Sequence, residues 1–198
     1  MRIKYFDNYR WLFSSLILIL LSSCSSASDN EKDKELKNAI SYLVEGTPPE
    51  LVRQNLFLLE RSGKSAFPVL VEVIDDNRNA AGSLQEARGY RQENGKAPEL
   101  YVTQIGDVAV SLLRSKIEGD RSGRYYPFYV LDRTNIKQWL AARGGKSLIE
   151  LRVDAAKQAL EVVKKKRANS DSDDLIRMTS IFEKRIADIE NGASPNIK

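Results

Sequence analysis

Histidine is absent from the 198-residue chain, and cysteine occurs only once. The lack of histidine excludes Ser-His and Cys-His nucleophilic arrangements, zinc sites with histidine ligands, and imidazole acid–base catalysis. A single cysteine, Cys24, also leaves no partner for an intramolecular disulfide. We therefore expect a protein that is not an enzyme and that holds no cofactor or metal ion.

Catalysis by carboxylates is the class of chemistry that these absences leave open. Two acidic side chains at a suitable distance suffice for glycoside hydrolysis. The candidates are Glu72, Asp75, Asp76 and Glu86, and a hydrolase would need two of them facing each other with shifted pKa values. Most other acidic residues have positions typical of helix caps or solvated helix faces.

Charge of one sign is not in large excess, because 31 basic side chains face 27 acidic ones. Half of the formal net charge of +4 comes from residues 1–10, where Arg2, Lys4 and Arg10 outnumber Asp7. The remaining chain is nearly balanced. We expect no nucleic-acid partner, since such partners select strongly basic surfaces.

A basic start followed by an apolar run is typical of a signal peptide. The run extends from Trp11 to Leu21 and is interrupted only by Ser14 and Ser15. A membrane-spanning helix needs about 20 apolar residues, and this run has about half that length. We predict that residues 1–23 are a signal peptide that is removed.

The residues Leu21-Ser22-Ser23-Cys24 resemble the lipobox of bacterial lipoproteins, in which an aliphatic and two small residues precede the modified cysteine. The resemblance implies cleavage before Cys24, lipid including palmitate on that cysteine, and anchoring to an envelope membrane. Ser25, rather than Asp, implies the periplasmic face of the outer membrane in a Gram-negative cell. Residues 24–34 are small, polar or charged, and we predict a flexible tether there.

Helical spacing of apolar residues predicts an all-α fold of about seven helices in antiparallel pairs, within one domain over residues 35–191 and with a frayed tail at 192–198. Thr47…Glu50 and Ser147…Glu150 match capping boxes. The predicted apolar face of the second helix consists of Leu51, Val52, Leu56 and Leu59, and Ile176 falls on that of the last helix. The expected helices cover residues 36–44, 48–62, 65–74, 103–117, 135–142, 148–167 and 172–190.

Residues 75–100 have three glycines, several charges and no apolar period, so we predict a long irregular insert that is partly disordered. Asp75, Asn77, Asn79 and Glu86 occupy ligand positions of a loop that resembles an EF-hand. However, Ala80 replaces the glycine that such a loop needs. An ordinary turn is therefore the favoured interpretation.

Two segments resemble HEAT-like repeats. They are Leu51 to Asp76, with Gly63 and Pro68 at the usual places, and Gly106-Asp107-Val108-Ala109 followed by Leu112-Leu113. The resemblance implies a short α-solenoid, whose curved surface would bind another macromolecule. The insert breaks the repeat spacing of about 40 residues.

An aromatic segment contains Tyr125, Tyr126, Phe128 and Tyr129. These rings could anchor a protein partner, because tyrosine offers a large amphipathic contact at low entropic cost. The alternative, which we favour for most of them, is that they fold the loop back onto the helices beside Trp139. The basic run at residues 164–167 is typical of a helix C-terminus.

These features predict a noncatalytic, membrane-anchored envelope lipoprotein that acts as a protein-interaction or scaffold module. The alternative within the binding proteins is a periplasmic inhibitor or immunity protein directed against a toxin or hydrolase. The carboxylate-dependent hydrolase is the third hypothesis. None of the three names a particular partner.

Overall fold

The computed structural model describes residues 30–82, 84, 104–119, 128, 130–170 and 172–192. These residues form an all-α fold, which confirms the predicted class, and they contain seven α-helices, one 3-10 helix and no named strand. The first helix covers residues 30–41. The others are α2 (Pro49–Arg61), the 3-10 helix η1 (Gly63–Ala66), α3 (Phe67–Glu72), α5 (Ile105–Ile117), α6 (Ile136–Ala141), α7 (Leu148–Ala168) and α8 (Asp173–Glu190).

The helix at residues 30–41 corrects the predicted tether, because residues 30–34 are helical rather than extended. Their charged side chains form the exposed side of a helix whose other side is buried. Lys37 pairs with Asp33 one turn earlier, at 3.5 Å, and with Glu72 of α3 at 2.9 Å. The polar residues here form the solvated face of a helix. Composition alone does not distinguish such a face from a flexible tether.

Helix α2 begins one residue later than predicted, and Thr47 is not its N-cap. Pro48 takes that place with φ −56° and ψ 136°. The ring of Pro49 disfavours helical geometry in the residue before it, so Pro48 stays extended. The Glu50 carboxylate accepts a hydrogen bond from Arg53 at 3.2 Å instead of closing a capping box.

The buried side of α2 consists of Val52, Leu56 and Leu59, whereas Leu51 is 39% exposed. The prediction that Leu51 is buried is thus wrong. Val52, Leu56 and Leu59 follow the helical period closely, and Leu51 lies about 100° around the axis from Val52.

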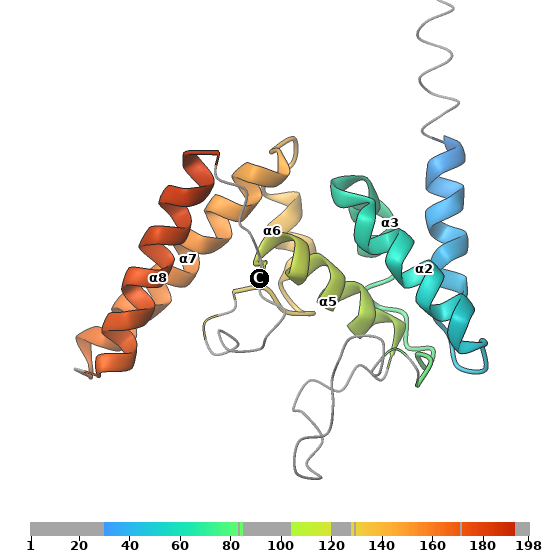
Figure 1. Cartoon of the computed structure of the whole chain (residues 1–198), viewed down its shortest axis with the longest axis horizontal. Helices are drawn as coiled ribbons and strands as arrows, with labels where there is room; N and C mark the ends of the chain where they lie inside the picture. Colours follow the sequence, from blue (N-terminus) through green and yellow to red (C-terminus); the bar gives the residue numbers. More distant parts are fainter. Residues whose placement is uncertain are drawn as a thin grey trace, which may run out of the picture.

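Helix α5 lies at the centre of the molecule, with α3 on one side and α7 on the other (Figure 1). Its residues are buried around most of its circumference, including Gly106 and Lys116. A helix that is buried all round must be covered by several neighbours. The elements before and after it in the chain are therefore organised around α5.

The first part of the predicted insert, residues 75–82, is irregular as expected, and it is attached to the helices by backbone hydrogen bonds and packing. Isolated β-bridges join Val44 to Ala80 and Asn79 to Gln104. Leu84 is fully buried in the main core. Residues 83 and 85–103, with Glu86 among them, lie outside the described residues.

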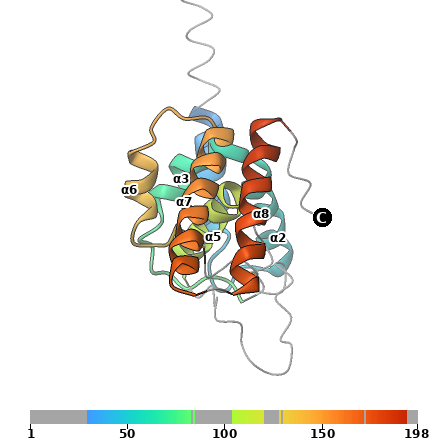
Figure 2. The same ribbon diagram turned by 90° about the vertical axis from the view of Figure 1, so that its left-hand side faces the viewer.

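The capping box at the start of α7 is confirmed. The Ser147 hydroxyl accepts from the Glu150 backbone N–H at 3.2 Å, and the Glu150 carboxylate accepts from the Ser147 N–H at 2.7 Å. From there α7 runs antiparallel to α8, and the two helices lie side by side (Figure 2).

Helix α7 takes part in two apolar clusters. Leu151 and Ala155 belong to the main core, together with residues 30–41 and helices α2, α3, α5 and α6. The second half of α7 and α8 form a smaller cluster of Ala156, Ala159, Leu160, Val163, Met178, Phe182 and Ile186.

Ile176 was predicted to lie on the apolar face of α8 but is 42% exposed, because the contact with α7 is made by the neighbouring stripe through Met178 and Phe182.

The HEAT-like solenoid stays a prediction, since the all-α class does not by itself establish regular repeat stacking. Among the described helices, none is long and apolar enough to cross a membrane.

Candidate binding site

The predicted lipidation site lies outside the part of the chain that the structure describes. This applies to Cys24, to the lipobox residues Leu21, Ser22 and Ser23, and to the whole of residues 1–29. Their roles remain predictions from the sequence.

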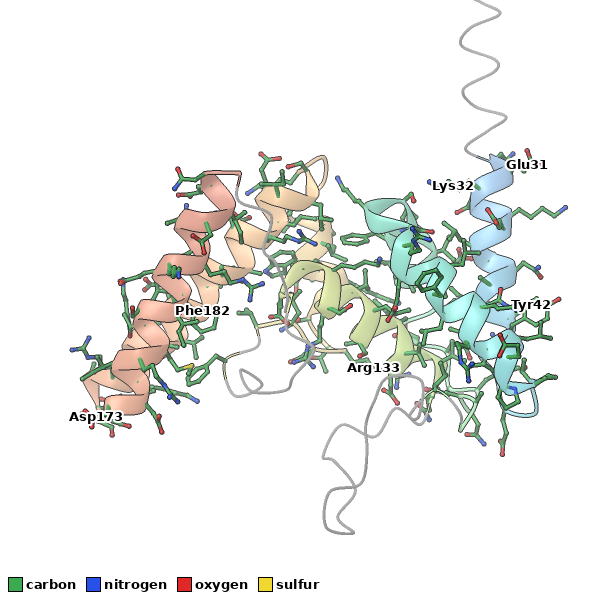
Figure 3. The ribbon with its side chains drawn as sticks, in the orientation of Figure 1. Glu31, Lys32, Tyr42, Arg133, Asp173 and Phe182 are labelled. Atoms are coloured by element: carbon green, nitrogen blue, oxygen red, sulfur yellow. The ribbon has the colours of Figure 1, made fainter. Side chains whose placement is uncertain are left out.

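Phe128 is the one member of the predicted aromatic anchor that the structure describes; Tyr125, Tyr126 and Tyr129 lie outside the described residues. Its ring meets Phe182 of α8 edge-on, with ring centroids 6.4 Å apart, and Lys166 of α7 lies 5.0 Å from its centroid. Figure 3 labels Phe182, which α8 presents toward this part of the molecule. Phe128 is half-buried against the α7–α8 pair, in the smaller apolar cluster and not in the main core that contains Trp139.

The three candidate catalytic carboxylates that the structure describes each pair with a different cation. Glu72 contacts Lys37 at 2.9 Å, Asp75 contacts Lys137, and Asp76 contacts Arg78 at 2.6 Å. The hydrogen bond from Arg78 holds the pKa of Asp76 below its usual value. Such pairs are typical of structural surface contacts.

The residues of the EF-hand-like pattern also make separate contacts. The Asn77 side-chain oxygen accepts a hydrogen bond from Arg133, and the Asn79 amide donates to Glu45, each at 2.9 Å. Within the described residues, no group of three or more histidine, cysteine or acidic side chains could hold a metal ion.

An apolar groove lies between the η1–α3 segment and the region where α6 turns into α7. Its volume is about 340 Å³, near the lower end of the range typical of small-ligand sites. Phe67 and Leu151 are buried at its base, while Pro68 and Ala141 are exposed at its edges. The apolar lining consists of Phe67, Pro68, Val71, Leu140, Ala141 and Leu151.

Three cations line the same groove: Lys64 from η1, Lys137 from α6, and Arg143 just after α6. Arg143 stacks over the Trp139 ring with its guanidinium carbon 4.1 Å from the centroid, and its Nε contacts Asp154 at 2.9 Å. Among the described residues that line the groove, none is acidic. The groove therefore combines an apolar floor with a cationic rim.

Breaks between short helices shape this groove. Pro68 lies in the first turn of the six-residue helix α3, where a missing N–H is tolerated. Helix α6 also has six residues, and Gly145 follows it with φ +85°, which allows the chain to reverse toward α7. Nothing in the local sequence around Pro68 or Gly145 indicates that these two positions line one groove.

Glu118 is a buried carboxylate that sequence reasoning missed. Its side chain is 7% exposed and accepts from the backbone N–H groups of Val130, at 2.7 Å, and Leu131, at 3.2 Å. Arg114 contacts it at 3.3 Å. Burial nevertheless raises the pKa of Glu118 above its ordinary value of 4.5, against the effect of these partners. The carboxylate fixes the chain after the aromatic segment to the end of α5.

Replacing Glu118 with glutamine should remove a pH dependence of folding that has a defined sign. Because the folded pKa is raised, the native state binds a proton before the unfolded state does as pH falls. As pH falls from 7 toward 4.5, the ordinary pKa of a glutamate, we expect the wild type to gain stability relative to Glu118→Gln. Urea unfolding of both proteins across this range measures the difference.

Glu150→Gln is the matched control, because hydrogen bonding to Ser147 lowers the pKa of Glu150. The stability that the Glu150 carboxylate contributes is fully present above its ordinary pKa of 4.5. It is lost as pH falls through the lower pKa of the folded state. The two variants should therefore deviate from wild type in different pH windows and with opposite signs. Parallel pH profiles for Glu118→Gln and wild type would contradict the assignment.

No protein-family model, curated protein or solved structure matches the chain.

Proposed function

We propose that this chain is a noncatalytic, membrane-anchored envelope lipoprotein whose helical domain binds a protein partner in the groove between α3 and α6. The observation that carries the binding role is the groove itself, an apolar surface bordered by Lys64, Lys137 and Arg143. Interaction sites commonly combine a desolvated apolar centre with a polar rim.

The order of basic start, apolar run, lipobox and polar residues supports the membrane anchor. Five residues separate Cys24 from residue 30, the first described residue of the helical domain. At about 3.5 Å per residue, an extended chain of this length spans only about 20 Å. A lipid on Cys24 would therefore hold the helical domain, and its groove, close to the membrane surface.

The noncatalytic part of the proposal is supported by composition and by ion pairing. The chain has no histidine, and Glu72, Asp75 and Asp76 are each paired with a separate cation. A binding role requires none of the catalytic arrangements that histidine provides.

Site-specific crosslinking in envelope membranes tests the anchor and the groove together. A photo-reactive amino acid is placed at Ala141, which lines the groove, or at Ala142, which is also exposed but does not line it. We expect the full chain to incorporate a palmitate analogue and to fractionate with membranes. Position 141 should then crosslink a protein in near-stoichiometric yield, and position 142 should not.

A Cys24→Ala version of the same chain provides the control for the anchor and should lose both the lipid label and membrane retention. A single toxin or hydrolase crosslinked at position 141 would identify an inhibitor, whereas several envelope components would identify a scaffold. Equal crosslinking from both positions would contradict the groove as the binding site, and unchanged membrane retention of Cys24→Ala would contradict the anchor.

A further inference from the structure

We propose that the groove between α3 and α6 docks a short acidic peptide segment of the partner, in which one or two apolar side chains are flanked by carboxylates. This inference rests on the proposed function and specifies the chemistry of the partner. Three properties of the groove carry it: its apolar lining, the cations on its rim and its limited length.

The apolar lining requires an apolar anchor. Pro68 and Ala141 leave apolar surface in contact with water at the edges, above a base formed by Phe67 and Leu151. Removing this apolar surface from water is favourable. One leucine-sized side chain inserted between α3 and α6 would cover both walls at once.

The rim favours a peptide with acidic residues beside the apolar anchor, because all the charged residues lining the groove are cations. Lys137 and Arg143 contact carboxylates, on Asp75 and Asp154. Lys64 differs from them, because it donates to the backbone carbonyl of Lys146, a neutral acceptor. The charge of Lys64 is not neutralised by that contact, and a carboxylate of the partner would complement it.

The dimensions favour a peptide over a long lipid chain. The walls α3 and α6 have six residues each, and six helical residues extend over only about 9 Å. A groove of about 340 Å³ between such walls accommodates one or two side chains, while the backbone that carries them remains at the open edge. Short peptide segments that use a few anchoring side chains bind in this manner.

Selection from a random dodecapeptide library displayed on phage tests the proposal, with the full chain immobilised in detergent micelles as the target. We expect the selected peptides to combine leucine, isoleucine, phenylalanine or tryptophan with adjacent aspartate or glutamate. Their affinity should fall as salt concentration rises. Basic or uncharged selected peptides, or no selection at all, would overturn the proposal.

Two pairs of variants localise the binding. Ala141→Trp should fill the groove and abolish binding of a selected acidic peptide, while Ala142→Trp, at the next exposed position, should retain it. Lys64→Glu should weaken binding about tenfold or more and should select basic peptides from the same library. Lys184→Glu, an equivalent charge change at an exposed position on α8, should leave both the affinity and the selected sequences unchanged.

Circular dichroism and thermal unfolding of each variant separate loss of the groove from loss of the fold.

Dodecanoate is the competing lipid probe. Displacement of the peptide by dodecanoate below its micellar concentration, with no acidic preference in the library, would assign the groove to a lipid anion and overturn the peptide proposal. Crosslinking at position 141 combined with a basic peptide preference would overturn only the partner chemistry and leave the proposed function intact.

Discussion

Gly106→Ala should lower the free energy of unfolding by about 3 kcal/mol or more, although alanine is the better helix former by about 1 kcal/mol. A Cβ atom at Gly106 would lie 2.1 Å from the Ile74 carbonyl oxygen and 2.7 Å from Nη2 of Arg133. The carbonyl belongs to the backbone, so it cannot rotate away as a side chain could. Overpacking alone costs about 1–3 kcal/mol, and lost hydrogen bonds add to it.

The Gly106 backbone has little freedom to relieve this clash. Its N–H donates to the Asp76 carbonyl at 2.9 Å, and the next link, from Ile105 N–H to the Arg78 carbonyl, is also 2.9 Å. Moving the start of α5 outward would break both hydrogen bonds. Urea unfolding monitored by circular dichroism, compared with wild type, measures the predicted loss.

Gly82→Ala is the matched control, because a Cβ there would meet nothing within 4 Å and the backbone is not left-handed. We expect it to change stability by less than about 1 kcal/mol and in the favourable direction, since alanine restricts the unfolded chain. If Gly106→Ala were as stable as Gly82→Ala, the close approach of α5 to Ile74 would be wrong.

Arg133→Met should cost about 3 kcal/mol, because the guanidinium makes four hydrogen bonds to two separate segments, the chain after α3 and the start of α5. Nε donates to the Ile74 carbonyl at 2.9 Å, and Nη2 donates to Asn77 at 2.9 Å. Nη1 donates to Gln104 at 2.8 Å and to Asp107 at 3.1 Å. Figure 3 shows Arg133 near the start of α5.

Arg53→Met is the comparison for a guanidinium that stays in solvent. Arg53 is 66% exposed and pairs with Glu50 on the same helix, whereas Arg133 is 31% exposed. We expect a change within about 0.5 kcal/mol at position 53, as for other exposed pairs. Arg133→Lys should recover little stability, because one ammonium cannot reach acceptors arranged around a planar fork. Equal effects at positions 53 and 133 would refute the role of Arg133.

The effects of Gly106→Ala and Arg133→Met should be less than additive, because both disrupt the contact at Ile74. This contact also bears on the groove. Ile74 follows α3 by two residues, and Arg133 precedes α6 by three residues. Their hydrogen bond therefore ties together the ends of the two helices that form the groove walls. Both variants should weaken peptide binding along with the fold.

Local features of the fold could be predicted because their causes lie within a few residues. The Ser147–Glu150 capping box is one example, since its hydrogen bonds join residues three apart. The buried stripe of Val52, Leu56 and Leu59 is another, because helical periodicity alone defines it. Periodicity did not exclude Leu51, and polar composition did not distinguish the helix at residues 30–34 from a tether.

The candidate site could not be predicted in the same way, because its parts come from distant positions. The hydrogen bonds of Arg133 span 59 residues to Ile74 and 26 residues to Asp107. Lys64 and Arg143 line one groove only because the tertiary structure brings the η1–α3 segment and α6 together.

The sequence by itself determined the all-α class, most helix limits and the exclusion of histidine chemistry, since these follow from local periodicity, capping and composition. Only the tertiary structure decided which faces meet, why position 106 must be glycine and where cations border apolar surface. These properties depend on contacts across the chain, and a pattern read along one helix contains no information about which neighbour covers it.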